Sequence, residues 1–271
     1  MRVTHLLNCY LWIVAVSFNA QTAKSAEIEI IAHRGASFDA PENTLAAVKL
    51  AWKQNADAVE FDVQLSRDGQ IVLMHDFDTK RTTGQVGVVA QQDWSQLKKL
   101  DAGSWKDAKF AGEKIPLLSE VLATVPAGKR VYIEVKCPPA ITTELKKVIE
   151  GSKLEPSQTV IICFSEEVVA AVKKEMPNVP AYWLADTKVN SQPPWTAERL
   201  IAGAQKANAD GVDLRAGSVV TKQLVQQLNK AKLPVCVWTV NDPLLAKQMI
   251  EAGVIGITTD RPQWMHEQLK K

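Results

Sequence analysis

Four short polar motifs stand at the ends of apolar runs, and their residue types suit phosphate chemistry. They are His33-Arg34-Gly35, Glu60-Phe61-Asp62, His75-Asp76 and Glu134-Val135-Lys136. Two histidines, three carboxylates and two fixed cations could hold a divalent metal against a phosphate and move protons beside it. Any one of these residues alone would indicate little. Their shared position, after runs that otherwise look buried, predicts a single site.

The three carboxylates predict a metal site. Glu60, Asp62 and Glu134 come from two apolar runs and offer oxygen ligands, which suit a hard cation such as Ca²⁺ or Mg²⁺. No cysteine stands with them, and histidine is available only at the edges of the set, so zinc is less expected. A lone carboxylate in a strand is usually a surface group or a salt-bridge partner. Three that end buried runs favour one bound divalent cation.

The two histidines are the candidate acid–base pair. Of the four histidines in the chain, His33 and His75 fall within these motifs. Chemistry at a phosphate ester needs a base for the nucleophile and an acid for the departing group, and histidine serves both near neutral pH. We predict that His33 is the base and His75 the acid, although the sequence alone does not assign the roles.

Arg34 and Lys136 are candidate phosphate ligands. Arg34 offers forked donors and Lys136 a point charge. The alternative for each cation is a salt bridge to one of the carboxylates, and both contacts can hold at once. Gly35 is expected to permit the turn that exposes Arg34.

From residue 27 onward, β-rich apolar runs alternate with helical patterns. The expected strands cover residues 28–32, 58–65, 71–75, 131–135, 159–164, 181–184, 211–214, 235–240 and 255–258. The expected helices cover residues 43–55, 119–125, 142–149, 166–174, 196–207, 221–231 and 243–252, with Gly151 and Gly253 as left-handed C-terminal caps. This alternation predicts an irregular (β/α)8 TIM barrel from residue 26 to 271. No glycine-rich nucleotide or phosphate loop is present, which disfavours a nucleotide-binding protein.

Two irregularities interrupt the alternation. Asp68-Gly69 is a two-residue hairpin signal, and such a loop would place His75 opposite Asp62 on the neighbouring strand. Residues 77–115 form an insertion too long for an ordinary connection, with Trp94 and Trp105 inside it. We expect the insertion to be either a functional lid or a small packed subdomain whose tryptophans fill its own core.

The N-terminus has the layout of a secretory leader. Arg2 precedes an apolar stretch over residues 6–18 and then a polar segment rich in small residues. The apolar run is short for a membrane span, so we expect a signal peptide over residues 1–25, with cleavage before Ala26. An uncleaved anchor is the alternative. The mature chain is therefore expected to be periplasmic or secreted, without stable membrane insertion.

Composition and cysteines narrow the function classes. The 271 residues carry a net charge of +2, with 46% hydrophobic and 23% charged residues, which is ordinary for a globular domain. No Lys/Arg cluster of the kind that binds nucleic acid is present. Cys137, Cys163 and Cys236 lie in or just after apolar runs, so we expect buried free thiols, with a disulfide as the minority alternative.

Six segments resemble the glycerophosphodiester phosphodiesterase family from about residue 28 to the C-terminus. They are IIAHRGASFDAPENT, AVEFDVQLSRDGQIVLMHD, IPLLSEVL, VYIEVK, VCVWTVN and GITTDRP. The resemblance implies a barrel of the phosphatidylinositol phospholipase C type, a divalent cation, and hydrolysis of small glycerophosphodiesters to glycerol 3-phosphate and an alcohol. It also implies that the substrate's glycerol hydroxyl attacks first to give a cyclic phosphate, although direct attack by water stays open.

The resemblance extends to further residues. Trp238 is similar to the family's tryptophan beside the glycerol pocket, with a core aromatic as the alternative. Glu42 and Asn43 match positions near the glycerol or metal, but Asn43 is favoured as a helix cap. The closing motif that contains Asp260 is expected to be structural. Two other functions stay open: a phosphodiesterase acting on lysophospholipids or phosphoinositides, and a catalytically inactive exported binding protein.

Overall fold

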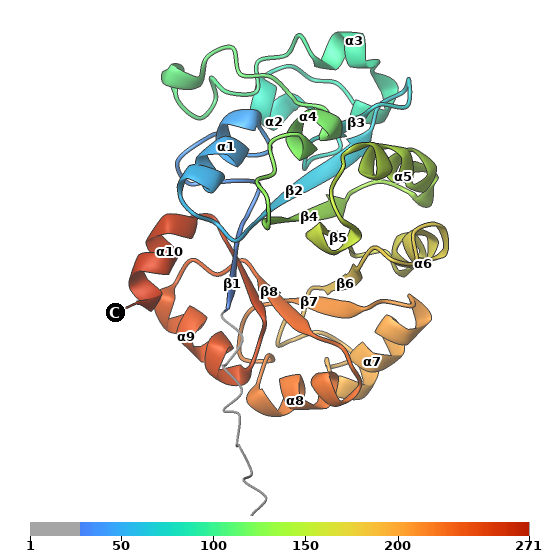
Figure 1. Ribbon diagram of the computed structural model, residues 1–271, viewed down its shortest axis with the longest axis vertical. Helices are drawn as coiled ribbons and strands as arrows, with labels where there is room; N and C mark the ends of the chain where they lie inside the picture. The colour runs from blue at the N-terminus through green and yellow to red at the C-terminus, as the bar shows by residue number, and fades with distance from the viewer. Residues whose placement is uncertain (1–27, 271) are drawn as a thin grey trace, which may run out of the picture.

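Eight parallel strands close into a barrel in the computed structural model, which describes residues 28–270 (Figure 1). The barrel strands are β1 (Glu29–Ala32), β2 (Ala58–Leu65), β4 (Arg130–Val135), β5 (Thr159–Cys163), β6 (Ala181–Ala185), β7 (Gly211–Arg215), β8 (Val235–Trp238) and β9 (Gly256–Thr259). Each strand pairs in parallel with its neighbour, and β1 joins both β9 and β2 to complete the circle. A ninth strand, β3 (Ile71–Leu73), pairs antiparallel with β2 outside the circle. The predicted irregular (β/α)8 barrel is confirmed.

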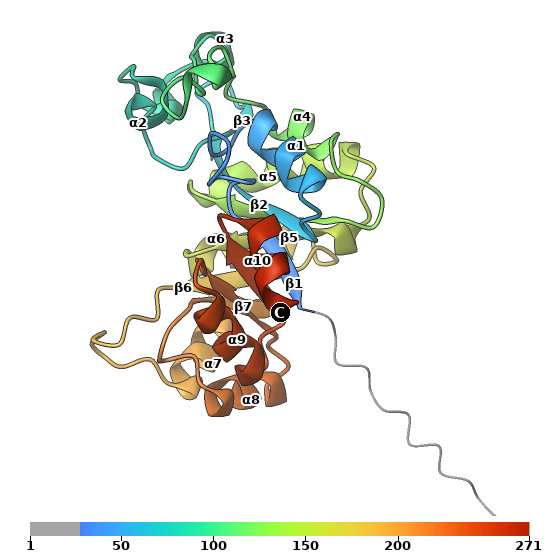
Figure 2. The same ribbon diagram turned by 90° about the vertical axis from the view of Figure 1, so that its left-hand side faces the viewer.

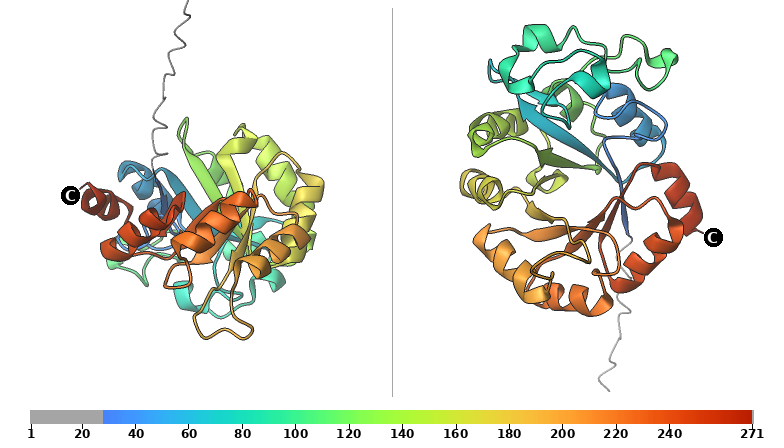
Figure 3. Two further views of the ribbon diagram at one scale, coloured as in Figure 1. Left: turned by 90° about the horizontal axis from the view of Figure 1, so that it is seen from below. Right: turned by 180° about the vertical axis from the view of Figure 1, so that it is seen from behind.

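Helices surround the strands on the outside of the barrel (Figures 1 and 3). The outer helices are α1 (Leu45–Lys53), α4 (Leu118–Leu122), α5 (Thr142–Gly151), α6 (Glu166–Glu175), α7 (Ala197–Lys206), α8 (Lys222–Lys230), α9 (Pro243–Ala252) and α10 (Pro262–Leu269). The short 3-10 helices η3 (Pro139–Ile141) and η4 (Pro156–Gln158) flank α5 in the chain. Apolar faces of the outer helices pack on the strands in two large clusters of buried residues.

The barrel interior is a third apolar layer. Ile31, Tyr132, Ile162, Tyr182 and Leu184 belong to a buried cluster contributed by different strands. Side chains therefore fill the barrel, as in other barrels of this type. This layer leaves the carboxyl ends of the strands available for a polar site.

Most predicted elements lie within a residue or two of the observed ones. However, α4 ends three residues earlier than expected, the predicted cap of α5 was wrong, and α10 was not predicted. Gly253 is the left-handed cap of α9 with φ 98°, as predicted. Gly151 instead lies inside α5, and the left-handed residue after that helix is Lys153 with φ 63°. No helix was expected after Thr258, yet α10 begins there at Pro262, a residue that suits the first turn of a helix.

The predicted hairpin register was wrong by one residue. Leu65 pairs with Ile71, and the amide of Ser66 donates to the carbonyl of Gln70 at 2.9 Å, so three residues form the loop. Gly69 adopts φ 80°, the left-handed residue expected in a three-residue hairpin loop. The amide of Met74 consequently donates to the carbonyl of Asp62, at 3.1 Å. His75 is not opposite Asp62, and it lies beyond the end of β3.

The insertion over residues 77–115 is a packed subdomain at one end of the molecule, beyond α1 and α4 (Figures 1 and 2). It contains α2 (Lys80–Thr83), η1 (Val89–Gln91), α3 (Trp94–Leu97) and η2 (Ala108–Phe110). Val89, Leu97 and Leu100 form its small core together with Met74, and Trp94 packs against that core. Trp105 is 39% exposed, so only one of the two tryptophans matches the expected packing.

The N-terminal leader expected over residues 1–25 lies outside the described residues. Among residues 28–270, no helix combines the length and the apolar character needed to span a bilayer. Within the same range, Cys137, Cys163 and Cys236 are free, as predicted; Cys163 and Cys236 are buried as expected, but Cys137 is only half-buried.

Candidate active site

The predicted site residues meet at a cavity of about 240 Å³ at the carboxyl ends of the barrel strands. Its predicted lining residues are His33, Arg34, Glu60, His75, Glu134, Lys136 and Trp238. Asp62 does not line this inner cavity, and its side chain is fully buried. His75 reaches the cavity from the segment after β3 and not from the strand itself.

The three carboxylates converge as the sequence predicted. Asp62 on β2 lies directly opposite Glu134 on β4, and Glu60 stands two residues earlier on the same face of β2. One oxygen from each of the three side chains lies within 4.8 Å of the others. Glu60 Oε1 and Asp62 Oδ1 are buried and accept no hydrogen bond. Buried oxygens without a donor are costly, so this acidic cluster fits a divalent cation.

The electrostatics of the cluster also favour a bound cation. Burial, together with the charges of Asp62 and Glu134, raises the pKa of Glu60 well above its usual value. Burial, together with the charge of Asp62, raises the pKa of Glu134 to about 7, although Lys136 opposes the shift. A positive charge at the centre of the cluster would favour the ionised form of all three carboxylates.

Arg34 is held at the cluster by a tight turn. Arg34 and Gly35 adopt φ 53° and 81°, and a Cβ at Gly35 would lie 2.6 Å from the carbonyl carbon of Ala47. Only glycine therefore fits this turn without a shift. The backbone amide of Arg34 donates to Glu60 Oε2 at 2.8 Å, and its Nη1 donates to Glu42 Oε1 at 2.8 Å.

Both candidate phosphate ligands also make the salt bridges named as their alternative. Arg34 Nε lies 3.2 Å from Asp62 Oδ2, within ion-pair distance but without hydrogen-bond geometry. Lys136 Nζ donates to Glu134 Oε1 at 2.8 Å and lies 3.8 Å from Asp62 Oδ1. Since both cations line the cavity as well, the salt bridges orient them toward it.

Asn43 is not the helix cap that the sequence favoured. The N-cap of α1 is Thr44, whose hydroxyl accepts from the amide of Ala47. Asn43 adopts φ 57° and turns inward, where its Nδ2 donates to Asp62 Oδ2 at 2.8 Å. Its Oδ1 accepts from the amide of Asp62 at 3.0 Å. The side chain therefore fixes the orientation of one carboxylate of the cluster.

Each histidine is paired with an aspartate through Nδ1. His33 Nδ1 lies 2.6 Å from Asp260 Oδ1, and His75 Nδ1 lies 2.7 Å from Asp76 Oδ1. These contacts occupy Nδ1 and leave Nε2 as the ring nitrogen available for proton transfer. The sequence reasoning gave Asp260 a structural role and Asp76 none. Two features of the sequence could have indicated these roles: Asp260 directly follows a strand, and Asp76 stands next to His75.

Arg81 of the insertion joins the two sides of the site. Its Nε donates to Asp76 Oδ2 at 2.6 Å, and its Nη1 and Nη2 donate to the two oxygens of Glu42 at 2.8 Å. Burial alone would raise the pKa of Asp76, but Arg81 and His75 lower it to about 2. A continuous chain of ion pairs therefore connects Arg34 to His75 through Glu42, Arg81 and Asp76. No feature of the sequence predicted these contacts of Arg81.

The wall opposite the carboxylates contains Trp238. Its Nε1 donates to the carbonyl of Asp213 at 3.2 Å, and its ring meets Phe164 edge to face with centroids 5.6 Å apart. The guanidinium of Arg215 lies 4.9 Å from the ring centroid. Asp213 is 1% exposed with one oxygen free of hydrogen bonds, and burial raises its pKa well above the usual value.

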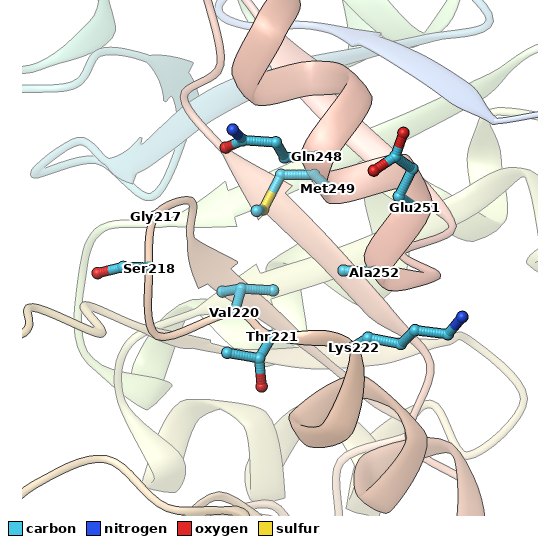
Figure 4. Close-up of a pocket in the computed structure, with 9 residues that line it drawn as sticks. All are labelled: Gly217, Ser218, Val220, Thr221, Lys222, Gln248, Met249, Glu251 and Ala252. Carbon is cyan, nitrogen blue, oxygen red and sulfur yellow. The ribbon is translucent and has the colours of Figure 1, made fainter.

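Another hollow, of about 630 Å³, lies away from this site between the segment before α8 and the end of α9 (Figure 4). None of the predicted site residues lines it. Its longer polar side chains, Lys222, Gln248 and Glu251, are exposed to solvent and do not converge on a point.

The carboxyl ends of barrel strands are where such folds carry their active sites. An acidic cluster there, with two aspartate-bound histidines and two cations, defines a barrel enzyme that acts on phosphate esters. The sequence model of the "Glycerophosphoryl diester phosphodiesterase family" matches residues 33–264. The chain belongs to this family and is an enzyme that hydrolyses glycerophosphodiesters.

Individual relatives agree with this assignment. The chain is 34% identical to a glycerophosphodiester phosphodiesterase of Caldanaerobacter subterraneus over 249 residues, 89% of this chain and 98% of that protein. It is 32% identical to a glycerophosphodiester phosphodiesterase of Bacillus subtilis over 256 residues, 89% and 86% of the two chains. A solved phosphodiesterase of Oleispira antarctica, in complex with the product sn-glycerol-3-phosphate, superimposes with a TM-score of 0.80 at 28% identity. That match covers 90% of this chain and 97% of the other.

Proposed function

We propose that this enzyme hydrolyses glycerophosphodiesters to glycerol 3-phosphate and an alcohol, with a divalent cation and with His33 and His75 as base and acid. The observation that carries the proposal is the acidic cluster, in which two buried oxygens lack donors, flanked by both histidines at one cavity. The glycerol 3-phosphate bound to the Oleispira antarctica relative supports glycerol 3-phosphate as the product of this enzyme.

Glu60, Asp62 and Glu134 would hold the cation, either Ca²⁺ or Mg²⁺. When bound, it would supply positive charge that stabilises the developing negative charge on the phosphoryl oxygens. Arg34 and Lys136 bind the same oxygens, because both line the cavity and are already oriented by salt bridges. Asn43 keeps Asp62 in its orientation.

The proton transfers are assigned to the two histidines. His33 accepts the proton of the attacking hydroxyl, from water or from the substrate's glycerol, at Nε2, while Asp260 holds Nδ1. His75 donates a proton from Nε2 to the departing alkoxide as the phosphorus–oxygen bond breaks, while Asp76 holds Nδ1. Such transfers contribute about 10²- to 10⁴-fold in rate.

The proposal is tested with the purified protein stripped of metal by EDTA. Glycerol 3-phosphate release is measured on glycerophosphocholine, glycerophosphoethanolamine and glycerophosphoglycerol, with and without added Mg²⁺, Ca²⁺ or Mn²⁺. We expect release from at least one diester that depends on an added cation. Full activity in excess chelator would contradict the proposed metal role.

We further propose that residues 1–25 direct export and are removed before Ala26. The support is the order of Arg2, the apolar stretch and the small residues. Expression of the full chain in a bacterial host, followed by N-terminal sequencing of the periplasmic fraction, should give Ala26 as the first residue. Recovery of intact chain in the membrane fraction would indicate an uncleaved anchor instead.

A further inference from the structure

A third hollow, larger than the inner cavity, borders that cavity at His75. This groove, about 790 Å³ in volume, lies along the segments that follow β3, β4 and β5. It shares His75, Glu134, Lys136 and Phe164 with the inner cavity. The two hollows therefore meet where the phosphate is proposed to bind.

The two hollows differ in size and chemistry. The inner cavity is small and carries the polar groups of Asp213, Arg215 and Thr239, which suit a short polyol such as glycerol. The groove is about three times larger, and aliphatic and aromatic side chains dominate its surface. Among its lining residues are Phe77, Cys137, Pro138, Pro139, Phe164 and Val168.

Two of the groove's aromatic rings are exposed to water. Phe77 is 69% and Phe164 44% exposed, although most large apolar side chains of the described chain are buried. Exposed apolar side chains that border a catalytic cavity are typical of a binding surface. Asp78 and Glu167 add exposed carboxylates to the lining, so the groove is unsuited to an anionic group.

The position of His75 decides which part of the substrate enters the groove. His75 lines both hollows and is the proposed acid, so it lies beside the ester oxygen of the departing alcohol. With glycerol in the inner cavity, the departing alcohol extends from the phosphate into the groove.

We infer that the enzyme accepts amphiphilic glycerophosphodiesters whose departing alcohol carries a hydrocarbon chain, and that the groove binds this chain. The inference rests on the proposed function. The reaction remains hydrolysis: the phosphorus–oxygen bond to the chain-bearing alcohol breaks, and water supplies its proton and the new phosphate oxygen. A chain on the glycerol, as in lysophosphatidylcholine, would instead have to fit the inner cavity of about 240 Å³.

The test uses alkyl esters of sn-glycerol 3-phosphate with ethyl, butyl, octyl and dodecyl groups, each below its critical micelle concentration. We expect kcat/KM to rise roughly twofold for each added methylene until the groove is filled, since an open groove buries each group only in part. Phe77→Ser should flatten this dependence. Val86→Ser is the matched control, because Val86 is 79% exposed in the same insertion and lies outside the groove.

The outcomes separate the inference from the function on which it rests. Hydrolysis of every ester with no dependence on chain length would overturn the inference and leave the proposed function intact. Preferred release of choline from lysophosphatidylcholine would overturn the orientation, because the chain would then lie on the glycerol side. Failure to hydrolyse even the ethyl ester and glycerophosphocholine would overturn the proposed function together with the inference.

Discussion

At the residue scale, the carboxylates of this site have two different roles. Glu60, Asp62 and Glu134 gather with two donor-free oxygens, Glu60 Oε1 and Asp62 Oδ1, among them. Asp76 and Asp260 instead accept hydrogen bonds at both oxygens and bind the histidines. The first arrangement is unfavourable without a cation, and the second is favourable by itself. Geometry distinguishes the two groups even though the residue types are the same.

The pairing of Asp260 should be visible in the stability of the folded protein. Burial alone would raise the pKa of Asp260, but hydrogen bonds from His33, Asn241 and Ser37 lower it from 3.8 to about 2. A pKa that is lower in the folded state stabilises the fold above about pH 4, and this stabilisation is lost as the pH falls toward 2. The full effect is at most about 2 kcal/mol.

Asp260→Asn should therefore lower the free energy of unfolding near pH 7. Below about pH 3, the free energy of unfolding of the variant should approach that of the wild type. Denaturant unfolding of both proteins across this pH range measures the difference. Two curves that stay parallel from pH 7 to pH 2 would contradict the assigned pairing.

At the element scale, the insertion is connected to the candidate active site through one helix. Arg81 on α2 binds Asp76 and Glu42, yet it lines neither the inner cavity nor the groove. Its effect on the reaction must pass through the residues it positions. The insertion is thereby part of the site and not only a packed appendage.

Arg81→Met should lower kcat by about 10- to 100-fold, because small displacements of His75, the proposed proton donor, are costly. KM should change little, since no substrate contact is removed. Lys80→Met, an exposed neighbour on α2, is the control and should behave as wild type. A variant at Arg81 with unchanged kcat would show that the chain of ion pairs has no catalytic role.

The sequence predicted the barrel and the meeting of the site residues because strand ends are strongly patterned. β2, residues 58–65, and α9, residues 243–252, were predicted to the residue. The predicted hairpin register was wrong because Asp68-Gly69 also fits a three-residue loop. Only the observed strand pairing distinguishes a two-residue loop from a three-residue loop. Asn43 was misjudged because Thr44 caps equally well. The role of Arg81 could not be predicted, since its partners Asp76 and Glu42 lie 5 and 39 residues away in the chain.

At the scale of the whole molecule, the closed barrel positions groups from distant parts of the chain. Asp260 follows the last strand and His33 the first, and both meet because β9 pairs with β1. The apolar interior layer lies beneath the site and closes its floor. The acidic cluster thus lies in an electrostatically unfavourable setting, which a bound cation would relieve.

A cation should therefore stabilise the folded protein. At one hundred times its dissociation constant, added Ca²⁺ or Mg²⁺ should contribute about 2.7 kcal/mol, or roughly 5–10 °C in Tm for a domain of this size. Glu134→Gln should lose most of this shift, while Glu144→Gln, which removes a surface partner of Lys147, should keep it. Equal shifts in the two variants would place the cation elsewhere.

His33 and His75 are proposed to transfer protons at the phosphodiester. The most direct measurement is kcat for glycerol 3-phosphate release by wild type, His33→Asn and His75→Asn with saturating cation, after circular dichroism has shown that all three are folded. We predict that each variant loses about 10²- to 10⁴-fold in kcat. Turnover within a few fold of wild type in either folded variant would contradict the claim.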